Sequence, residues 1–381
     1  LQLIQTYQLT YIGHETANGV PLVLETTSDT ELMNNPRASV QQVYGRIMED
    51  LDEAITLLTG ASARADKAEI SVEVAYGLRA RANLLMGKWA AAASDAAKAY
   101  GTSAPYSVAD VSQPTFYNAT DNAWIWGIVV TTEDYLAKTG IVNWPSNLCS
   151  LTGMGYTTAA SATDVAYRLI NKNLWAKIPE TDVRKGWWVD EDLHSPVLDN
   201  GLGEDYAYYW ANGMFNGGTF PSKFSPYTNV KFGPDNGTFA DTDNAQDWPL
   251  MRVEEMKLIE AEALGRDNLA TGKQKLEEFV RQYRDPSYTC TAGSLDAFID
   301  EVWFQRRVEL WGEGFALFDI LRLKKPIIRQ GANYPINSTF AEIAAEAPIM
   351  IYRIPEAETS VNSAITEADN NPAAMAPTPV N

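Results

Sequence analysis

The sequence predicts a mainly α-helical protein, in which a tetratricopeptide-like helical scaffold carries a large irregular, loop-rich insert. Apolar residues recur at three- and four-residue steps near both ends of the chain, as they do in amphipathic helices. Between residues 101 and 247 this period weakens, and Gly, Pro, Asn and Thr become frequent. We therefore expect one unit in three portions: the first part of the scaffold (1–100), a loop- and aromatic-rich ligand-binding portion (101–247), and the second part of the scaffold with a C-terminal tail (248–381).

The first 100 residues predict three helices. The first begins at a capping box formed by Ser39 and Gln42 and ends just before Gly60. A second ends at Gly87, and an alanine-rich third helix ends near Tyr100. Small side chains on the third helix would let it pack closely on the second, as in a tetratricopeptide hairpin. Because one such repeat is visible and not an array, a tetratricopeptide adaptor for other proteins is disfavoured.

The middle portion predicts long loops between short elements. Residues 124–130 are rich in aromatic and β-branched side chains and predict a strand, and residues 164–175 predict a helix. Helices are expected to resume at Trp248, with Asp247 as the N-cap and Pro249 in the first turn. Long structured loops usually carry function, so the middle portion is where we expect a ligand to bind.

The most informative feature is a set of charges on a helix face that should be buried. Arg306 lies on the same helical stripe as the apolar residues Phe298 and Leu310. A buried cation needs an anionic partner. We therefore expect an internal ion-pair network that holds two helices together and that is formed by Arg306, Glu309, Glu313, Asp319 and Arg322.

This arrangement resembles the signature of the SusD/RagB family, the surface nutrient-binding lipoproteins of Bacteroidetes, whose late helices read roughly E-R-R-x-E-L-x-x-E-G-x-R-x-x-D-L-x-R. Residues 306–322 match most of its charged positions, whereas Gln305 replaces the first Glu and Ala316 replaces an Arg. Three other segments resemble further family elements in the same order: 252–263, 354–358 and 370–372.

The resemblance implies a non-catalytic protein that binds an oligosaccharide or glycan at the cell surface and delivers it to a SusC-like TonB-dependent transporter. It also implies a signal peptide and a lipidated N-terminal Cys that anchors the protein to the outer membrane. The chain begins without Met at Leu1, which we interpret as an N-terminal truncation. A net charge of −19 disfavours nucleic acid and direct contact with anionic lipid as partners.

The sequence contains no G-x-S-x-G elbow, no H-E-x-x-H motif and no phosphate-binding loop of the form G-x-x-x-x-G-K-[ST]. His14 and His194 stand apart from partner motifs. Cys149 and Cys290 form no C-x-x-C pair, and whether they meet is left open. Residues 241–247 offer oxygen ligands for calcium but lack the Gly and distal Glu of an EF-hand, so a solvated turn is favoured. We expect no catalytic residue, no metal site and no cofactor.

Aromatic residues in the middle portion are the strongest indication of a ligand site. Flat aromatic faces match the apolar faces of sugar rings, while nearby amides and carboxylates bind the hydroxyl groups. Trp187 and Trp188 are expected to be structural. Ligand contact is predicted for six residues: Trp144, Tyr156, Tyr208, Tyr209, Trp210 and Asn212. Two alternatives stay open, namely a peptide or other nutrient on the same scaffold, which acidity weakly favours, and a less favoured helical glycosidase acting through two carboxylates.

Overall fold

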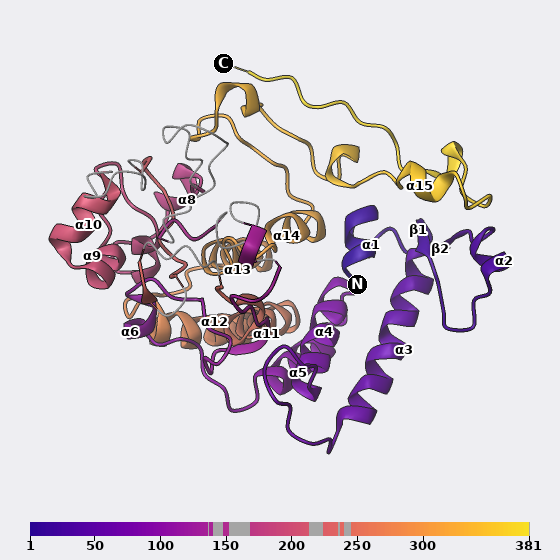
Figure 1. The fold of residues 1–381 in the computed structure, drawn as a ribbon, viewed down its shortest axis with the longest axis horizontal. Helices are drawn as coiled ribbons and strands as arrows, with labels where there is room; N and C mark the ends of the chain where they lie inside the picture. The colour runs from indigo at the N-terminus through magenta and orange to yellow at the C-terminus, as the bar shows by residue number, and fades with distance from the viewer. Residues whose placement is uncertain are drawn as a thin grey trace.

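The computed structural model of the protein describes residues 1–135, 137–139, 148–151, 168–212, 224–234, 237–239 and 245–380. Helices dominate these ranges, which confirms the mainly α fold class, and the strands within them form two two-stranded sheets. Figure 1 shows α3 at one end of the molecule, α11 to α13 near its centre, and α9 with α10 at the opposite end.

The first hundred residues form α1 (Gln2–Tyr7), β1 (Asn18–Pro21), α2 (Asp29–Leu32), β2 (Arg37–Ser39), α3 (Val40–Leu58), α4 (Val72–Leu85) and α5 (Trp89–Tyr100). The middle portion holds α6 (Val108–Val111), β3 (Trp124–Ile128), η1 (Ala137–Thr139), α8 (Lys172–Trp175), η2 (Val183–Trp187), α9 (Pro196–Leu202) and α10 (Glu204–Ala211). The last part holds β4 (Trp248–Arg252), α11 (Val253–Asp267), α12 (Leu269–Tyr283), α13 (Leu295–Glu309), α14 (Ala316–Arg322), η4 (Ile336–Ser338), η5 (Pro348–Met350), α15 (Glu356–Thr359) and η6 (Glu367–Asp369).

The three helices predicted in the first hundred residues are confirmed as α3, α4 and α5. The backbone N–H of Gln42 donates to Ser39 Oγ at 3.2 Å, and the backbone N–H of Ser39 donates to Gln42 Oε1 at 2.8 Å, which completes the capping box. Gly60 and Gly87 both take positive φ, at 79° and 72°, where a side chain would be strained. The buried alanines of α5 let this helix pack between α4 and α11.

A strand stands where the sequence predicted the start of a helix. Residues 248–252 form β4, which pairs antiparallel with β3, so that Trp124 faces Arg252 and Ile128 faces Trp248. Asp247 is not an N-cap, because its carboxylate accepts hydrogen bonds from the backbone N–H groups of Ala119 and Val130, each at 2.8 Å. The strand predicted over 124–130 is confirmed as β3, and pairing with it keeps β4 extended despite the Pro near its start. The helix begins only at Val253.

The helix predicted over residues 164–175 is wrong for residues 168–171, and its first four positions lie outside the described residues. Leu169 pairs with Thr228, and the backbone N–H of Ile170 donates to the carbonyl of Tyr227 at 3.1 Å. The side chain of Asn171 then caps α8, which is a single turn. Tertiary pairing with a distant segment has therefore replaced a local helix.

The buried apolar side chains of the described residues form four clusters. One lies beneath α1 and α3, one between α4, α5 and α11, and one between α11, α12 and α13. The largest fills the middle portion around Phe116, Trp187 and Phe232, and Val308 on α13 belongs to it. The middle portion therefore packs its own aromatic core against one face of α13.

The C-terminal segment returns to the start of the chain, as the yellow trace in Figure 1 shows. The backbone N–H of Tyr352 donates to the carbonyl of Thr6 at 3.0 Å, and Asn371 Nδ2 donates to the carbonyl of Tyr7 at 2.6 Å. Residues near both termini are thus held together by hydrogen bonds.

Gly272 on α12 is expected to be essential for the close approach of α11 and α12. A Cβ at this position would lie 2.3 Å from the Cα of Gly265 and 2.8 Å from the carbonyl oxygen of Ala261, so the backbones would have to separate. Gly272→Ala should lower the free energy of unfolding by about 1–3 kcal/mol in urea denaturation. As a matched control, Gly45→Ala in α3 meets nothing within 4 Å and should raise it by about 0.5–1 kcal/mol. Equal effects of the two substitutions would contradict the expectation.

Candidate ligand-binding surface

A buried cluster of ion pairs centred on Glu309 joins the middle portion to the scaffold. Glu309 is the last residue of α13, and its carboxylate lies 2.8 Å from Arg284, 3.3 Å from Arg184 and 3.4 Å from Arg252. All four side chains are fully buried. Although burial alone would raise it, the three guanidinium groups hold the pKa of Glu309 well below its usual range. Three segments that are distant in sequence thus meet at one carboxylate.

Lys231 forms a second link between the middle portion and the end of α13. Its Nζ donates to the carbonyls of Glu309 and Trp311 at 2.8 and 2.9 Å and lies 2.7 Å from a carboxylate oxygen of Glu313. Burial lowers the pKa of Lys231 to about 8, although the charge of Glu313 opposes this. Three aromatic rings of the middle core surround the ammonium group, with centroids at 4.8 to 5.0 Å: Phe116, Trp187 and Phe232.

A separate cluster ties α11 to α13 and α14. Arg306 Nε lies 2.8 Å from Asp319 Oδ2, and Arg322 Nε lies 2.7 Å from Asp319 Oδ1. Arg322 also pairs with Glu262 on α11 at 2.7 Å. Although burial opposes the shift, the charge of Arg322 lowers the pKa of Glu262 to about 2.

The five residues predicted to form one network therefore occupy two clusters. Arg306, Asp319 and Arg322 belong to the Glu262 cluster, whereas Glu309 and Glu313 belong to the Glu309 cluster. Among the described residues, no ion pair connects the two clusters. The sequence prediction did not include the cations that complete the Glu309 cluster, because they come from other segments of the chain. One of them, Arg252, lies in the segment 252–263, which resembles a further element of the family. These cations are Arg184, Lys231, Arg252 and Arg284.

The hairpin of α9 and α10 carries the candidate ligand surface. The Oγ of Ser195 caps α9 by accepting from the backbone N–H of Leu198, and Gly203 at φ 82° turns the chain into α10. On α10, Ala207 and Ala211 are buried in the middle core. Tyr208 lies on another face of the helix and is 47 % exposed. The core therefore supports the hairpin from beneath while a tyrosine side chain reaches solvent.

Asn212 lies directly after α10. Its Nδ2 donates to the carbonyl of Tyr208 at 3.0 Å, which closes the last turn of the helix. Its Oδ1 accepts no hydrogen bond from any described residue, and the side chain is partly exposed. An aromatic ring and an amide oxygen thus belong to one short stretch of the chain, which is the combination that binds the faces and the hydroxyl groups of a sugar.

The other predicted ligand residues are only partly covered by the described ranges. Trp144 and Tyr156 lie outside them. Tyr209 and Trp210 lie on α10, and their side chains are outside the described part. The binding role of all six residues stays a prediction. Trp187 and Trp188, which we expected to be structural, are 0 % and 1 % exposed in the middle core.

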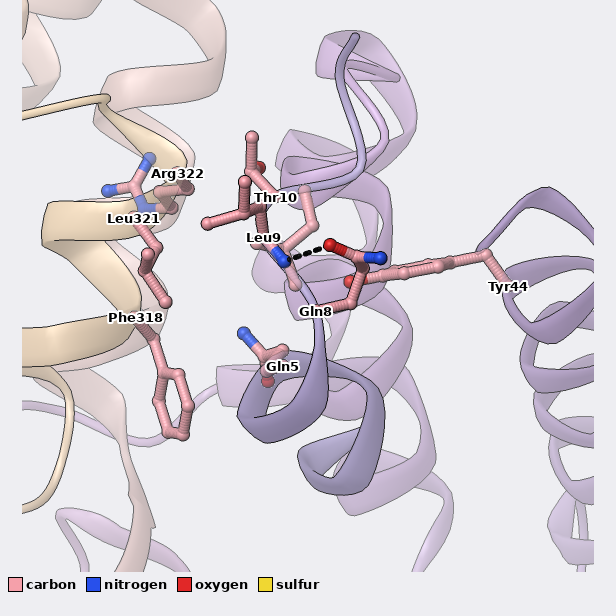
Figure 2. Close-up of a pocket in the computed structure, with 9 residues that line it drawn as sticks. Gln5, Gln8, Leu9, Thr10, Tyr44, Phe318, Leu321 and Arg322 are labelled. Carbon is pink, nitrogen blue, oxygen red and sulfur yellow. Dashed lines mark hydrogen bonds between the residues drawn. The ribbon is translucent and has the colours of Figure 1, made fainter. Parts of the chain in front are cut away.

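A partly open cavity between the start of the chain and α14 is too small for a nutrient. Figure 2 shows Gln8 and Thr10 on one side of it and Phe318 and Leu321 on the other. Its volume is about 10 Å³, which holds roughly one water molecule. This cavity therefore cannot hold a sugar or a peptide.

The described ranges contain no group of three or more His, Cys, Asp or Glu side chains able to hold a metal ion. His14 Nε2 lies 2.9 Å from a carboxylate oxygen of Glu346. Cys149 and Cys290 are buried and are not joined by a disulfide. None of the described helices is both long enough and apolar enough to cross a membrane.

Comparison with known proteins identifies the family. The sequence profile of the SusD family matches residues 157–372, more than half of the chain, and the chain belongs to this family. The structure resembles a SusD-like carbohydrate binding protein from Bacteroides vulgatus, with 21% sequence identity and a TM-score of 0.73, over 98% of this chain and 75% of the other. It also resembles a SusD superfamily protein from Bacteroides thetaiotaomicron, with 19% identity and a TM-score of 0.72, over 97% and 74%.

A third solved structure, a laminarin-binding SusD-like protein, is similar with 19% identity and a TM-score of 0.56, over 95% of this chain and 75% of the other. No curated protein sequence matches the chain. At these identities the solved structures establish the fold, including its tetratricopeptide-like helical scaffold. Together with the family match they confirm the resemblance inferred from the sequence.

Removing the charge of Glu309 is expected to destabilise the whole fold. Glu309→Gln leaves three buried guanidinium groups around a neutral amide, and breaking a buried ion pair typically costs about 3–5 kcal/mol. Urea denaturation at neutral pH should show a loss of this size in the free energy of unfolding. The control Glu53→Gln changes an exposed residue of α3 and should alter it by less than about 0.5 kcal/mol. Similar losses in both variants would show that the cluster does not hold the fold together.

Acid is expected to weaken the protein through Glu262. Because its pKa is lowered from 4.5 to about 2, its contribution is fully present above pH 4.5 and is lost as the pH falls towards 2. This contribution amounts to about 3 kcal/mol. Glu262→Gln should be less stable near neutral pH and should show a shallower fall in unfolding free energy between these pH values, measured by urea denaturation at each pH. If the variant and the native protein lost stability in parallel, the assignment to Glu262 would be wrong.

Proposed function

We propose that this SusD family member binds an oligosaccharide at the α9–α10 hairpin without cleaving it. The observation that carries the proposal is the exposed Tyr208 on α10, followed by Asn212 with an amide oxygen that accepts no hydrogen bond from any described residue. The tyrosine ring would contact the apolar face of a sugar, and the amide oxygen would accept a hydrogen bond from a hydroxyl group. Trp144, Tyr156, Tyr209 and Trp210 are proposed to complete the site.

The architecture beneath the hairpin suits a binding surface that is formed before the ligand arrives. Ala207 and Ala211 rest on the middle core, and Lys231 and Arg184 fix that core to α13 through buried ion pairs. A surface that does not have to order itself loses less entropy on binding. Recognition by stacking and hydrogen bonding needs no general acid or base, in keeping with a non-catalytic role.

Family membership supports a place at the cell surface, because SusD family proteins are nutrient binders there. We infer that the protein is held at the outer membrane by an N-terminal lipid anchor and passes its ligand to a SusC-like TonB-dependent transporter. Two similar structures are described as carbohydrate binding and laminarin binding, which makes neutral glucans the first ligands to test. The net charge of −19 favours cationic peptides as the second candidate class.

Isothermal titration with laminari-oligosaccharides and other neutral oligosaccharides, alongside short cationic peptides, tests this function. We expect saturable binding of a neutral glycan, and we expect Tyr208→Ala to weaken it about tenfold, because an aromatic contact of this kind contributes about 1 kcal/mol or more. The control Tyr352→Ala removes another exposed tyrosine, near α1 at the far end of the molecule, and should leave affinity unchanged.

Product analysis of the same samples separates binding from hydrolysis. Intact glycan after incubation supports a capture protein, whereas cleaved glycan would establish a glycosidase. Binding of peptides alone would transfer the assignment to peptide uptake. Equal weakening by Tyr208→Ala and Tyr352→Ala would remove the α10 hairpin as the site.

A further inference from the structure

A groove of about 490 Å³ lies between α13 and the turn that follows α8, a volume typical of sites for small molecules. None of the described residues of α9 or α10 lines it, so it is distinct from the candidate carbohydrate surface. The side chains that matter here come from the turn and from α13: Lys177, Asp300, Glu301, Trp303, Phe304 and Arg307.

Both carboxylates of this groove already have partners within the protein. Asp300 forms an ion pair with Lys325. Glu301 Oε1 accepts hydrogen bonds from the hydroxyl of Tyr288 at 2.7 Å and from Gln305 Nε2 at 2.9 Å. Neither carboxylate therefore forms an ion pair with Lys177 or Arg307.

Arg307 has no such partner among the described residues. Its neighbour Arg306 pairs with Asp319 at 2.8 Å, whereas the side chain of Arg307 meets neither a carboxylate nor a hydrogen-bond acceptor among the described residues. The guanidinium carbon lies 4.9 Å from the centroid of the Trp303 ring, and burial lowers the pKa of Arg307. An oxyanion in the groove would accept hydrogen bonds from this partly buried guanidinium, and hydrogen bonds between charged groups are stronger than neutral ones.

Lys177 supplies a second cation on the opposite wall of the groove. It is exposed, and its ammonium group has no carboxylate partner in the described part of the chain. Lys177 and Arg307 thus place in one groove two cations that form no ion pair with any described residue, although the protein has a net charge of −19. The aromatic side chains of Trp303 and Phe304 provide apolar surface beside them.

We propose that the groove at Arg307 is a second ligand site, which binds the carboxylate of an acidic sugar or of a peptide C-terminus. The planar guanidinium matches the two oxygens of a carboxylate, and Lys177 adds a point charge. Trp303 and Phe304 contact the body of the ligand. Because the two cations are balanced by two carboxylates in the lining, the groove favours a singly charged anion over a phosphate dianion.

The test is isothermal titration at low salt with oligogalacturonate and with a short neutral-bodied peptide that has a free C-terminus. The methyl ester of the sugar and the C-terminal amide of the peptide serve as uncharged partners of each ligand. We expect at least one carboxylate ligand to bind saturably and its uncharged partner to bind about tenfold more weakly or not at all, since a hydrogen bond to a charged group contributes about 1.5–3 kcal/mol. Whichever ligand binds identifies the source of the carboxylate.

Three variants assign the site. Arg307→Ala should reduce carboxylate affinity about tenfold or more, and Lys177→Gln, which changes an exposed side chain, should reduce it about threefold. Arg46→Ala removes the same charge from α3 and should have no effect. Binding of neutral glucans should survive in Arg307→Ala, which separates this site from the α10 surface.

Thermal unfolding shows which variants are folded. If Arg307→Ala is not folded, Lys177→Gln still tests the proposal. The proposal is overturned if neither carboxylate ligand binds the native protein up to about 10 mM. It is also overturned if charged and uncharged ligands bind equally, or if Lys177→Gln and Arg307→Ala match Arg46→Ala.

Discussion

The carboxylate of Glu309 is the interaction on which the rest of the architecture depends. It is fully buried at the end of α13 and receives arginines from the middle portion, from the end of β4 and from the end of α12. A buried carboxylate is costly to ionise without such partners, and the arginines are themselves held by further buried carboxylates, Asp182, Glu254 and Glu313. The segments must therefore assemble together, which makes the junction between scaffold and middle portion a single cooperative unit.

Lys231 shows why this junction uses charges in addition to apolar packing. The middle core meets α13 mainly at Val308 and its partly buried neighbours, which is a narrow apolar contact. Hydrogen bonds from Lys231 to two carbonyls and a carboxylate fix the direction of approach, which apolar contact alone leaves loosely defined. The aromatic core in turn packs against α9 and α10 and fixes their position relative to the scaffold. The buried alanines Ala207 and Ala211 thus connect the proposed carbohydrate surface to the core that Lys231 attaches to the end of α13.

Local signals in the sequence were sufficient for much of the scaffold. The capping box at Ser39, the glycines at positions 60 and 87, and the apolar periods placed α3, α4 and α5 correctly, because each feature acts within a few residues. The strand β4 and the extended segment at 169–170 were missed, because pairing with distant residues overrides the local preference there. For the same reason the five predicted charges were not separated into two clusters, and the cations that surround Glu309 were not recognised. Of the predicted ligand residues, only Tyr208 and Asn212 have described side chains.

The buried ion pairs that join the middle portion to the scaffold are separate from the proposed ligand surface on α10. This separation explains how the fold can persist while the sequence of the surface changes. The scaffold matches a Bacteroides vulgatus protein with a TM-score of 0.73 at 21% identity. Charges such as Glu309 and Arg252 cannot change singly without leaving a buried ion unpaired, so each is constrained by several others. Tyr208, in contrast, is 47 % exposed on the helix whose residues Ala207 and Ala211 are buried in the middle core. If α10 is the ligand surface that we propose, its exposed residues are free of the constraint that the buried ion pairs place on the junction.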